Sequence, residues 1–95
     1  MSAAEAPDPI AAAFAAARSD GRPALVAYLT AGDPDLERSR DLFLALGQGG
    51  ADLLEVGVPF SDPIADGPVI QRAAERALAS GATLAKILDL CGGLA

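Results

Sequence analysis

The sequence predicts an α/β fold in which parallel strands alternate with helices. Two short runs rich in apolar and β-branched residues, about residues 24–30 and 51–58, have the length and alternation of strands. Each run precedes a segment whose apolar residues recur at helical spacing, about residues 36–46 and 68–80. Strands that alternate with helices pair in parallel through right-handed crossovers, so both strands are expected in one sheet.

A further helix is predicted before the first strand. Asp8 and Pro9 are a start signal, because an aspartate accepts backbone N–H groups at a helix start and proline suits the first turn. The apolar stripe of this helix consists of Ile10, Ala13, Phe14 and Ala17. Residues 19–23 end it.

The first strand has two unlike faces. One is uniformly apolar and consists of Leu25, Ala27 and Leu29. The other is mixed and consists of Val26, Tyr28 and Thr30. After the strand, Gly32 supplies a turn, and Asp33 and Pro34 predict the N-cap and first residue of the next helix, with no further role.

The second strand contains a carboxylate among apolar residues. Glu55 shares a face with Leu53 and Gly57, and the missing side chain of Gly57 is expected to leave space beside it. Burying a carboxylate is costly, so this position calls for a reason. The turn-rich loop that follows contains Asp62 and Asp66, and loops after strands are where catalytic residues concentrate.

Two helices are predicted at the end of the chain. The first carries a continuous apolar stripe of Val69, Ile70, Ala73, Ala74, Ala77 and Leu78. Gly81 is expected to stop it, and Thr83 to cap the last helix. Cys91 repeats at helical spacing with Leu84, Ile87 and Leu88, which favours a core residue over a reactive thiol.

Composition excludes several function classes. Residues are 52% hydrophobic, yet no apolar run reaches the roughly 20 residues that span a bilayer, and Glu5 and Asp8 occupy the N-terminal region that is basic in a signal peptide. A cytoplasmic location without membrane attachment is therefore expected. The net charge of −6 repels nucleic acid. With no histidine and Cys91 as the single cysteine, neither an internal disulfide nor a metal site is expected.

Three collinear segments resemble the tryptophan synthase alpha subunit family. They are ALVAYLTAGDPDLE (residues 24–37), GVPFSDPIADGP (57–68) and QRAAERALASGATLAKILDL (71–90), and the resemblance covers about residues 10–90. It implies a (β/α)8 TIM barrel, which needs about 250 residues. The 95 residues would be one partial domain, 1–95, holding the N-terminal βαβα part and lacking the later strands.

The resemblance implies cleavage of indole-3-glycerol phosphate to indole and glyceraldehyde 3-phosphate in tryptophan biosynthesis, a carbon–carbon lyase reaction without a cofactor. It assigns general acid and base catalysis to Glu55, since a carboxyl in an apolar interior has a raised pKa. Asp66 would bind the indole N–H as positive charge develops. Tyr28 stands where the family usually has a phenylalanine lining the indole pocket.

The resemblance also implies a partner, a beta subunit in an alpha2-beta2 heterotetramer. The expected contact is the loop formed by Pro59, Phe60, Ser61 and Asp62. Thr30 and Gly32, beside the end of the first strand, are expected to support the loop that carries Asp66.

Several alternatives stay open. Glu55 is alternatively an edge-strand carboxylate facing water, Asp66 a helix cap, and Asp62 a solvated loop residue. Two adjacent parallel strands cannot close a barrel, and the phosphate site after the later strands would be missing, so no efficient lyase activity is expected of the 95 residues alone. Other readings are a non-catalytic remnant that binds a beta subunit and a different phosphate-binding barrel with a similar βα unit.

Overall fold

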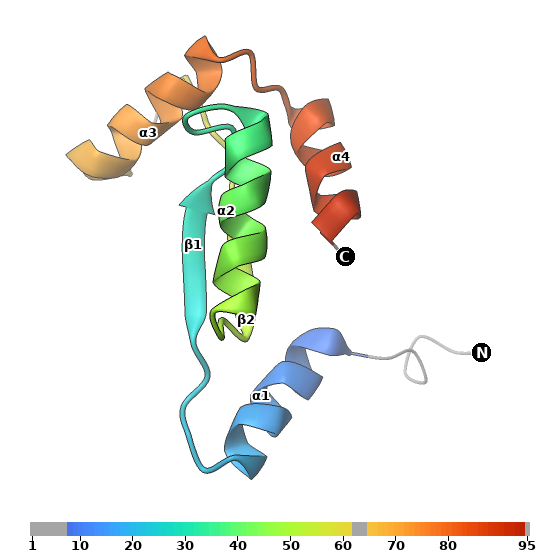
Figure 1. Ribbon diagram of the computed structural model, residues 1–95. Coiled ribbons are helices and arrows are strands. Elements are labelled where there is room, and N and C mark those ends of the chain that lie inside the picture. The colour runs from blue at the N-terminus through green and yellow to red at the C-terminus, as the bar shows by residue number, and fades with distance from the viewer. Residues whose placement is uncertain (1–7, 62–64, 95) are drawn as a thin grey trace.

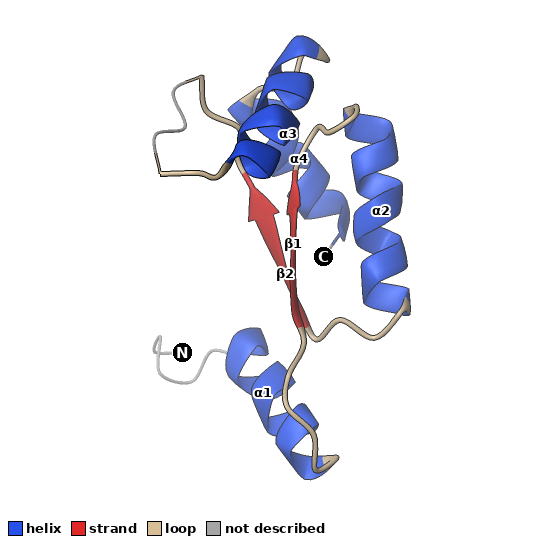
Figure 2. Ribbon diagram, turned by 90° about the vertical axis from the view of Figure 1, so that its left-hand side faces the viewer, coloured by secondary structure: helices blue, strands red, loops and turns tan. Residues whose placement is uncertain are grey.

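The computed structural model describes residues 8–61 and 65–94. In chain order its elements are α1 (Pro9–Ser19), β1 (Val26–Thr30), α2 (Leu36–Gln48), β2 (Leu53–Gly57), α3 (Pro68–Ala79) and α4 (Leu84–Leu94). The two strands pair in parallel, which confirms the predicted α/β class. α2 and α4 lie on the same side of this sheet, and α1 lies at the opposite end of the strands from α3 (Figure 1, Figure 2).

Both strands are shorter than predicted at their beginnings. Just before β1 and β2, the regular ladder is not formed. Instead, the N–H groups of Asp52 and Leu53 both donate to the Leu25 carbonyl, at 2.9 and 3.2 Å. Regular pairing starts at Val26 opposite Leu53 and ends at Thr30 opposite Gly57. The bond from the Ala31 N–H to the Gly57 carbonyl, at 2.8 Å, extends the contact past the last pair.

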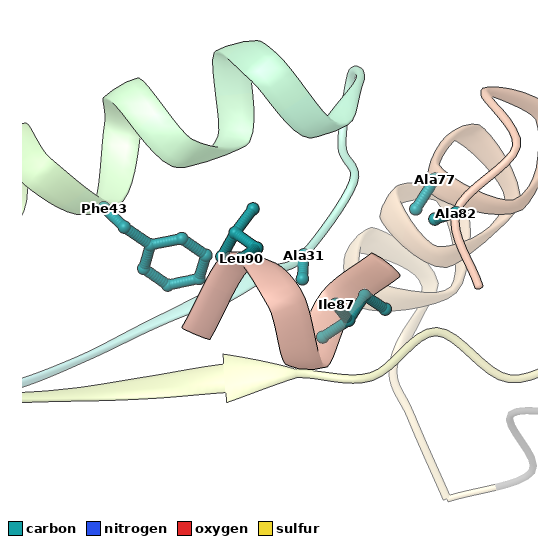
Figure 3. Close-up of a cluster of buried hydrophobic side chains, with 6 residues drawn as sticks. All are labelled: Ala31, Phe43, Ala77, Ala82, Ile87 and Leu90. Carbon is teal, nitrogen blue, oxygen red and sulfur yellow. The ribbon is translucent and has the colours of Figure 1, made fainter. Parts of the chain in front are cut away.

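The core lies between the sheet and its helices rather than on both faces of the sheet. Its buried residues are Ala31, Phe43, Ala77, Ala82, Ile87 and Leu90 (Figure 3). Leu29, Leu54 and Val56 from the strands are half-buried against this cluster. Burial of such apolar side chains is the main term that offsets the entropy of ordering the chain.

The opposite face of the sheet is open. Val26 is 42% exposed and Tyr28 is 44% exposed, and Glu55 next to them is also exposed. A parallel sheet is ordinarily covered on both faces. In the described residues, Val26 and Tyr28 on the mixed face of β1 are therefore uncovered, whereas Thr30 at the end of the strand is buried.

Two of the three predicted helix starts have the predicted cap. The Asp8 side chain accepts hydrogen bonds from the N–H groups of Ile10 and Ala11, as expected for an N-cap. The Thr83 hydroxyl likewise accepts a bond from the Lys86 N–H, at 3.3 Å.

The prediction for Asp33 and Pro34 was wrong. α2 begins at Leu36, and its N-cap is Asp35, whose carboxylate accepts a bond from the Arg38 N–H at 2.8 Å. Asp33 turns instead toward α3, where it pairs with Arg76, and the peptide bond between Asp33 and Pro34 is cis. The helix therefore begins two residues later than the dipeptide pattern indicated.

Gly32 holds the loop after β1 against the helices. Its φ of +92° belongs to the region that favours glycine, and a Cβ built there would lie 2.7 Å from the Cβ of Ala82. Its N–H donates to the buried Ser39 hydroxyl at 3.1 Å, and its carbonyl accepts a bond from the Ser80 hydroxyl at 3.0 Å. The loop is thus fixed to both α2 and the end of α3.

The last two helices follow the predicted boundaries, with one difference in the apolar stripe. Gly81, with a φ of +94°, ends α3, and the Ala82 N–H returns to the Ala77 carbonyl at 3.2 Å. Only the alanines of the stripe are buried, whereas Val69 at the start of α3 is 74% exposed. Cys91 is half-buried against the core, as predicted.

No single helix among the described residues is long and apolar enough to cross a membrane. α3 and α4 pass the length and composition test only as a pair, with a bend of 100° between them.

Candidate active site

Glu55 and Tyr28 lie side by side on the open face of the sheet. They are register partners in β2 and β1, so their side chains leave the sheet on the same face from adjacent strands. Glu55 is exposed, and the apolar interior predicted around it is not formed by the described residues. For residues 8–61 and 65–94, the alternative of a carboxylate facing water describes its surroundings correctly.

The space expected beside Glu55 at Gly57 is occupied. A Cβ built on Gly57 would collide with the ring and hydroxyl of Tyr28, which therefore lies across the bare backbone of β2. The missing side chain does make room, but for the phenol of the neighbouring strand rather than for a cavity. Gly57 thereby sets how the Tyr28 ring sits beside Glu55.

Asp66 lies in the turn that precedes α3. The alternative that Asp66 caps this helix was wrong, because the N-cap is Gly67 and no side chain caps the first turn. Asp66 is exposed, and its carboxylate makes no hydrogen bond to the described part of the chain. Its backbone carbonyl accepts a bond from the Gln71 side-chain N–H, at 2.8 Å.

Of the three described residues predicted to meet a partner, two are exposed. Pro59 is half-buried, whereas Ser61 is exposed and Phe60 is 65% exposed. Asp62 lies outside the described residues. An aromatic side chain in solvent, directly after a strand of the candidate site, is available for contact with another surface.

Thr30 ends β1 on the same face as Tyr28, but it is only 5% exposed. Its hydroxyl makes no hydrogen bond to a described residue. Gly32 contacts the helices through Ser39 and Ser80. Whether either residue supports the Asp66 loop stays a prediction.

Residues that the sequence did not single out hold the opposite ends of the strands. Arg22 forms two hydrogen bonds with the Asp52 carboxylate, at 2.8 and 2.9 Å, and the Leu25 N–H donates to the same carboxylate at 2.7 Å. The Arg22 hydrogen bond, followed by the Leu25 N–H, lowers the pKa of Asp52 from 3.8 to about 2. This cluster joins the beginnings of both strands, away from Glu55.

No described residues form a group of three or more metal-ligating side chains. An apolar groove of about 300 Å³ lies between β1 and α2 and includes Leu25, Leu29 and Leu46. Neither Glu55 nor Tyr28 lines this groove, so it is separate from the carboxylate site.

Comparison with known proteins places these residues in a family context. The family profile described as tryptophan synthase alpha chain matches residues 14–95. The tryptophan synthase alpha chain of Burkholderia thailandensis is 60% identical over 76 residues, which are 80% of this chain and 28% of that protein.

Solved structures give the same result. The tryptophan synthase subunit alpha of Legionella pneumophila superposes with a TM-score of 0.85 and 44% identity, over 90% of this chain and 32% of that one. A solved protein of Aquifex aeolicus superposes with a TM-score of 0.88 and 42% identity, over 93% of this chain and 35% of that one. The chain thus spans about a third or less of the length of each of these relatives.

Proposed function

The chain belongs to the tryptophan synthase alpha chain family, its two parallel strands are part of a TIM barrel, and from this premise we propose that Glu55 and Asp66 serve a lyase reaction. The proposed reaction is retro-aldol cleavage of indole-3-glycerol phosphate to indole and glyceraldehyde 3-phosphate. It needs no cofactor. Residues 1–95 supply the carboxylates and Tyr28, and the remainder of a barrel supplies the opposite wall and the phosphate site.

The chemistry divides between the two carboxylates. Glu55 delivers a proton to carbon 3 of the indole ring and removes the proton of the side-chain hydroxyl that becomes the aldehyde. The carbon–carbon bond between ring and side chain breaks, and its electron pair returns to the ring. Asp66 accepts a hydrogen bond from the indole N–H and stabilises the positive charge that develops there before cleavage.

The observation that carries this proposal is the cross-strand pair of Glu55 and Tyr28 on the uncovered face of the sheet. A carboxylate beside an aromatic ring suits a planar, apolar substrate that must exchange a proton. The Asp66 carboxylate is uncommitted to the described residues and lies in the loop that connects β2 to α3. In a complete barrel, strand-end loops of this kind surround the active site.

The test is a fusion of residues 1–95 to the part of the Burkholderia thailandensis relative that follows its matched region. Indole released from indole-3-glycerol phosphate is the measured quantity. We expect Glu55→Gln and Asp66→Asn each to lower kcat by about 10²- to 10⁴-fold, the range for a lost acid, base or charge-stabilising group.

Matched controls are Glu75→Gln and Asp89→Asn, which change the same side-chain types at exposed helix positions. These variants should retain the activity of the unsubstituted fusion. A folded fusion whose indole release is indifferent to Glu55→Gln would refute the proposed role of Glu55.

A second function, contact with a beta subunit, is favoured by the exposure of Phe60. In this proposal the loop residues Pro59 to Asp62 touch the partner of an alpha2-beta2 heterotetramer. Phe60→Ser should weaken binding of the fusion to a tryptophan synthase beta subunit in an isothermal titration, while Leu88→Ser, at an equally exposed leucine of α4, should not. Equal affinities for the two variants would exclude this loop from the interface.

A further inference from the structure

The beginning of α3 has no side-chain cap, so the Asp66 carboxylate does not cap it. Gly67, the N-cap, has no side chain with which to cap the helix. Pro68 follows at the first helical position, where its missing N–H removes one of the donors that a cap would satisfy. The helix therefore starts without drawing on the carboxylate of the residue before it.

Gln71 forms a hydrogen bond with the backbone of Asp66. Its side-chain Nε2 donates to the Asp66 carbonyl at 2.8 Å, while its own backbone N–H donates to the Gly67 carbonyl at 2.9 Å. Side chains of helical residues lean toward the helix N-terminus, which brings the half-buried Gln71 back over the first turn. The contact holds the peptide of Asp66 through its carbonyl and does not involve its carboxylate.

α3 is itself fixed to the strand that carries Tyr28. The Arg76 guanidinium donates to both carboxylate oxygens of Asp33, at 2.8 and 3.1 Å, and the Ser80 hydroxyl donates to the Gly32 carbonyl. Both acceptors lie in the loop directly after β1. A continuous set of contacts thus runs from the end of β1 along α3 to the backbone of Asp66.

We propose that Gln71 is a positioning residue for Asp66, acting through the Asp66 carbonyl and not through the substrate. The inference rests on the proposed role of Asp66. Catalytic groups must be held within about 0.5 Å of their productive position, and a misplacement of about 1 Å lowers rates by roughly 10²-fold. A hydrogen bond that holds the peptide and spares the carboxylate meets this need.

The first test uses the 95-residue chain and Gln71→Met, which keeps length and helix propensity but removes the donor. The control is Arg72→Met, the same replacement at the exposed neighbouring position. By NMR relaxation, the order parameter of the Asp66 amide should fall from about 0.85 to below about 0.6 in Gln71→Met. It should stay unchanged in Arg72→Met, and the thermal midpoint of both variants should stay within about 2 °C of the parent.

The second test places both substitutions in the fusion described above. Gln71→Met should lower kcat by about 10- to 10²-fold with KM nearly unchanged, because the substrate contacts remain and only Asp66 is misplaced. Arg72→Met should have the activity of the unsubstituted fusion.

An Asp66 amide that stays equally ordered in Gln71→Met overturns the proposal, as does a fall in thermal midpoint that accounts for the lost activity. If the unsubstituted fusion has no Glu55-dependent activity, the proposed function fails instead. In that case the order parameter alone decides whether Gln71 positions residue 66.

Discussion

At the scale of the residue, the contact of Tyr28 with Gly57 makes a sharp prediction. Gly57→Ala places a methyl group where the phenol lies, so the ring must leave its position over β2. We expect the free energy of unfolding to fall by no more than about 1 kcal/mol, because the clashing atoms are the far end of a side chain that is 44% exposed and can turn into solvent. Because Tyr28 is the only tyrosine and the chain has no tryptophan, near-ultraviolet circular dichroism should report the displaced ring directly.

Gly47→Ala is the matched control for this substitution. A Cβ at Gly47 meets no other atom within 4 Å, and the residue lies in α2, where alanine is stabilising by about 0.5–1 kcal/mol relative to glycine. An unchanged tyrosine signal in Gly57→Ala would mean that the phenol does not lie across β2.

Asp52 makes a prediction about pH. Its folded pKa of about 2 lies below the ordinary value of 3.8, so its pairing with Arg22 and Leu25 stabilises the fold above pH 3.8. This stabilisation is lost as the pH falls from 3.8 to about 2, because the unfolded state takes up the proton first and the folded state takes it up only near pH 2. Asp52→Asn should therefore lower the urea midpoint near neutral pH and have progressively less effect below pH 3.8.

The control for Asp52 is Asp41→Asn, at an exposed position of α2. Its urea midpoint near neutral pH should differ little from that of the parent. A difference between Asp52→Asn and the parent that stays constant down to pH 2 would show that the carboxylate charge is not what stabilises the strand beginnings.

The sequence singled out the candidate site residues but not the residues that hold them in place. Glu55 and Asp66 stand out because each is a carboxylate in a distinctive local setting, and that setting can be recognised in a linear pattern. Asp52 and Gln71 have no such signal. Asp52 binds Arg22, which is 30 residues away in the sequence. Gln71 donates to a backbone carbonyl, and every residue has such a carbonyl, so no pattern of side chains marks this contact.

At the scale of the element, the periodic segments were correctly identified and their beginnings were less certain. α1 starts at Asp8 and Pro9 because local chemistry alone decides it. Asp33 and Pro34 show the same local pattern, yet Asp33 pairs with Arg76, 43 residues later. Asp35 is the N-cap of α2 instead. Tertiary contact overrides a local signal of this kind.

The pair of Asp33 and Arg76 predicts an energetic link between the loop after β1 and α3. In a double-mutant cycle with Asp33→Asn and Arg76→Met, the two substitutions together should destabilise less than the sum of each alone. Since the Arg76 side chain is 55% exposed, the coupling should be modest and should weaken with added salt. Urea unfolding at two salt concentrations measures both effects.

The control pair for this cycle is Arg38 with Asp35, whose guanidinium and carboxylate come no closer than 3.8 Å. Its coupling should be smaller. Strict additivity of Asp33→Asn and Arg76→Met at low salt would show that the contact does not join the loop to α3.

At the scale of the whole molecule, the sheet is covered on one side. The core lies beneath α2 and α4, whereas Tyr28 and Glu55 face solvent. The family and barrel type were recognisable because the strand and loop after it carry a specific motif. What the sequence could not supply was the surroundings of Glu55, which is exposed in the described residues of a chain that spans about a third of its relatives' length.

This uncovered face makes the last prediction. The 95-residue chain alone should release no indole from indole-3-glycerol phosphate above the level of its Glu55→Gln variant, whereas the fusion to the rest of a barrel should. Exposure of Glu55 leaves it solvated, and the absent opposite wall removes the orientation that is worth about 7 to 11 kcal/mol of a barrier. Rapid, Glu55-dependent release by the chain alone would mean that copies of it cover one another's open face. Sedimentation of the same sample would then reveal an assembly in place of a 9.5 kDa monomer.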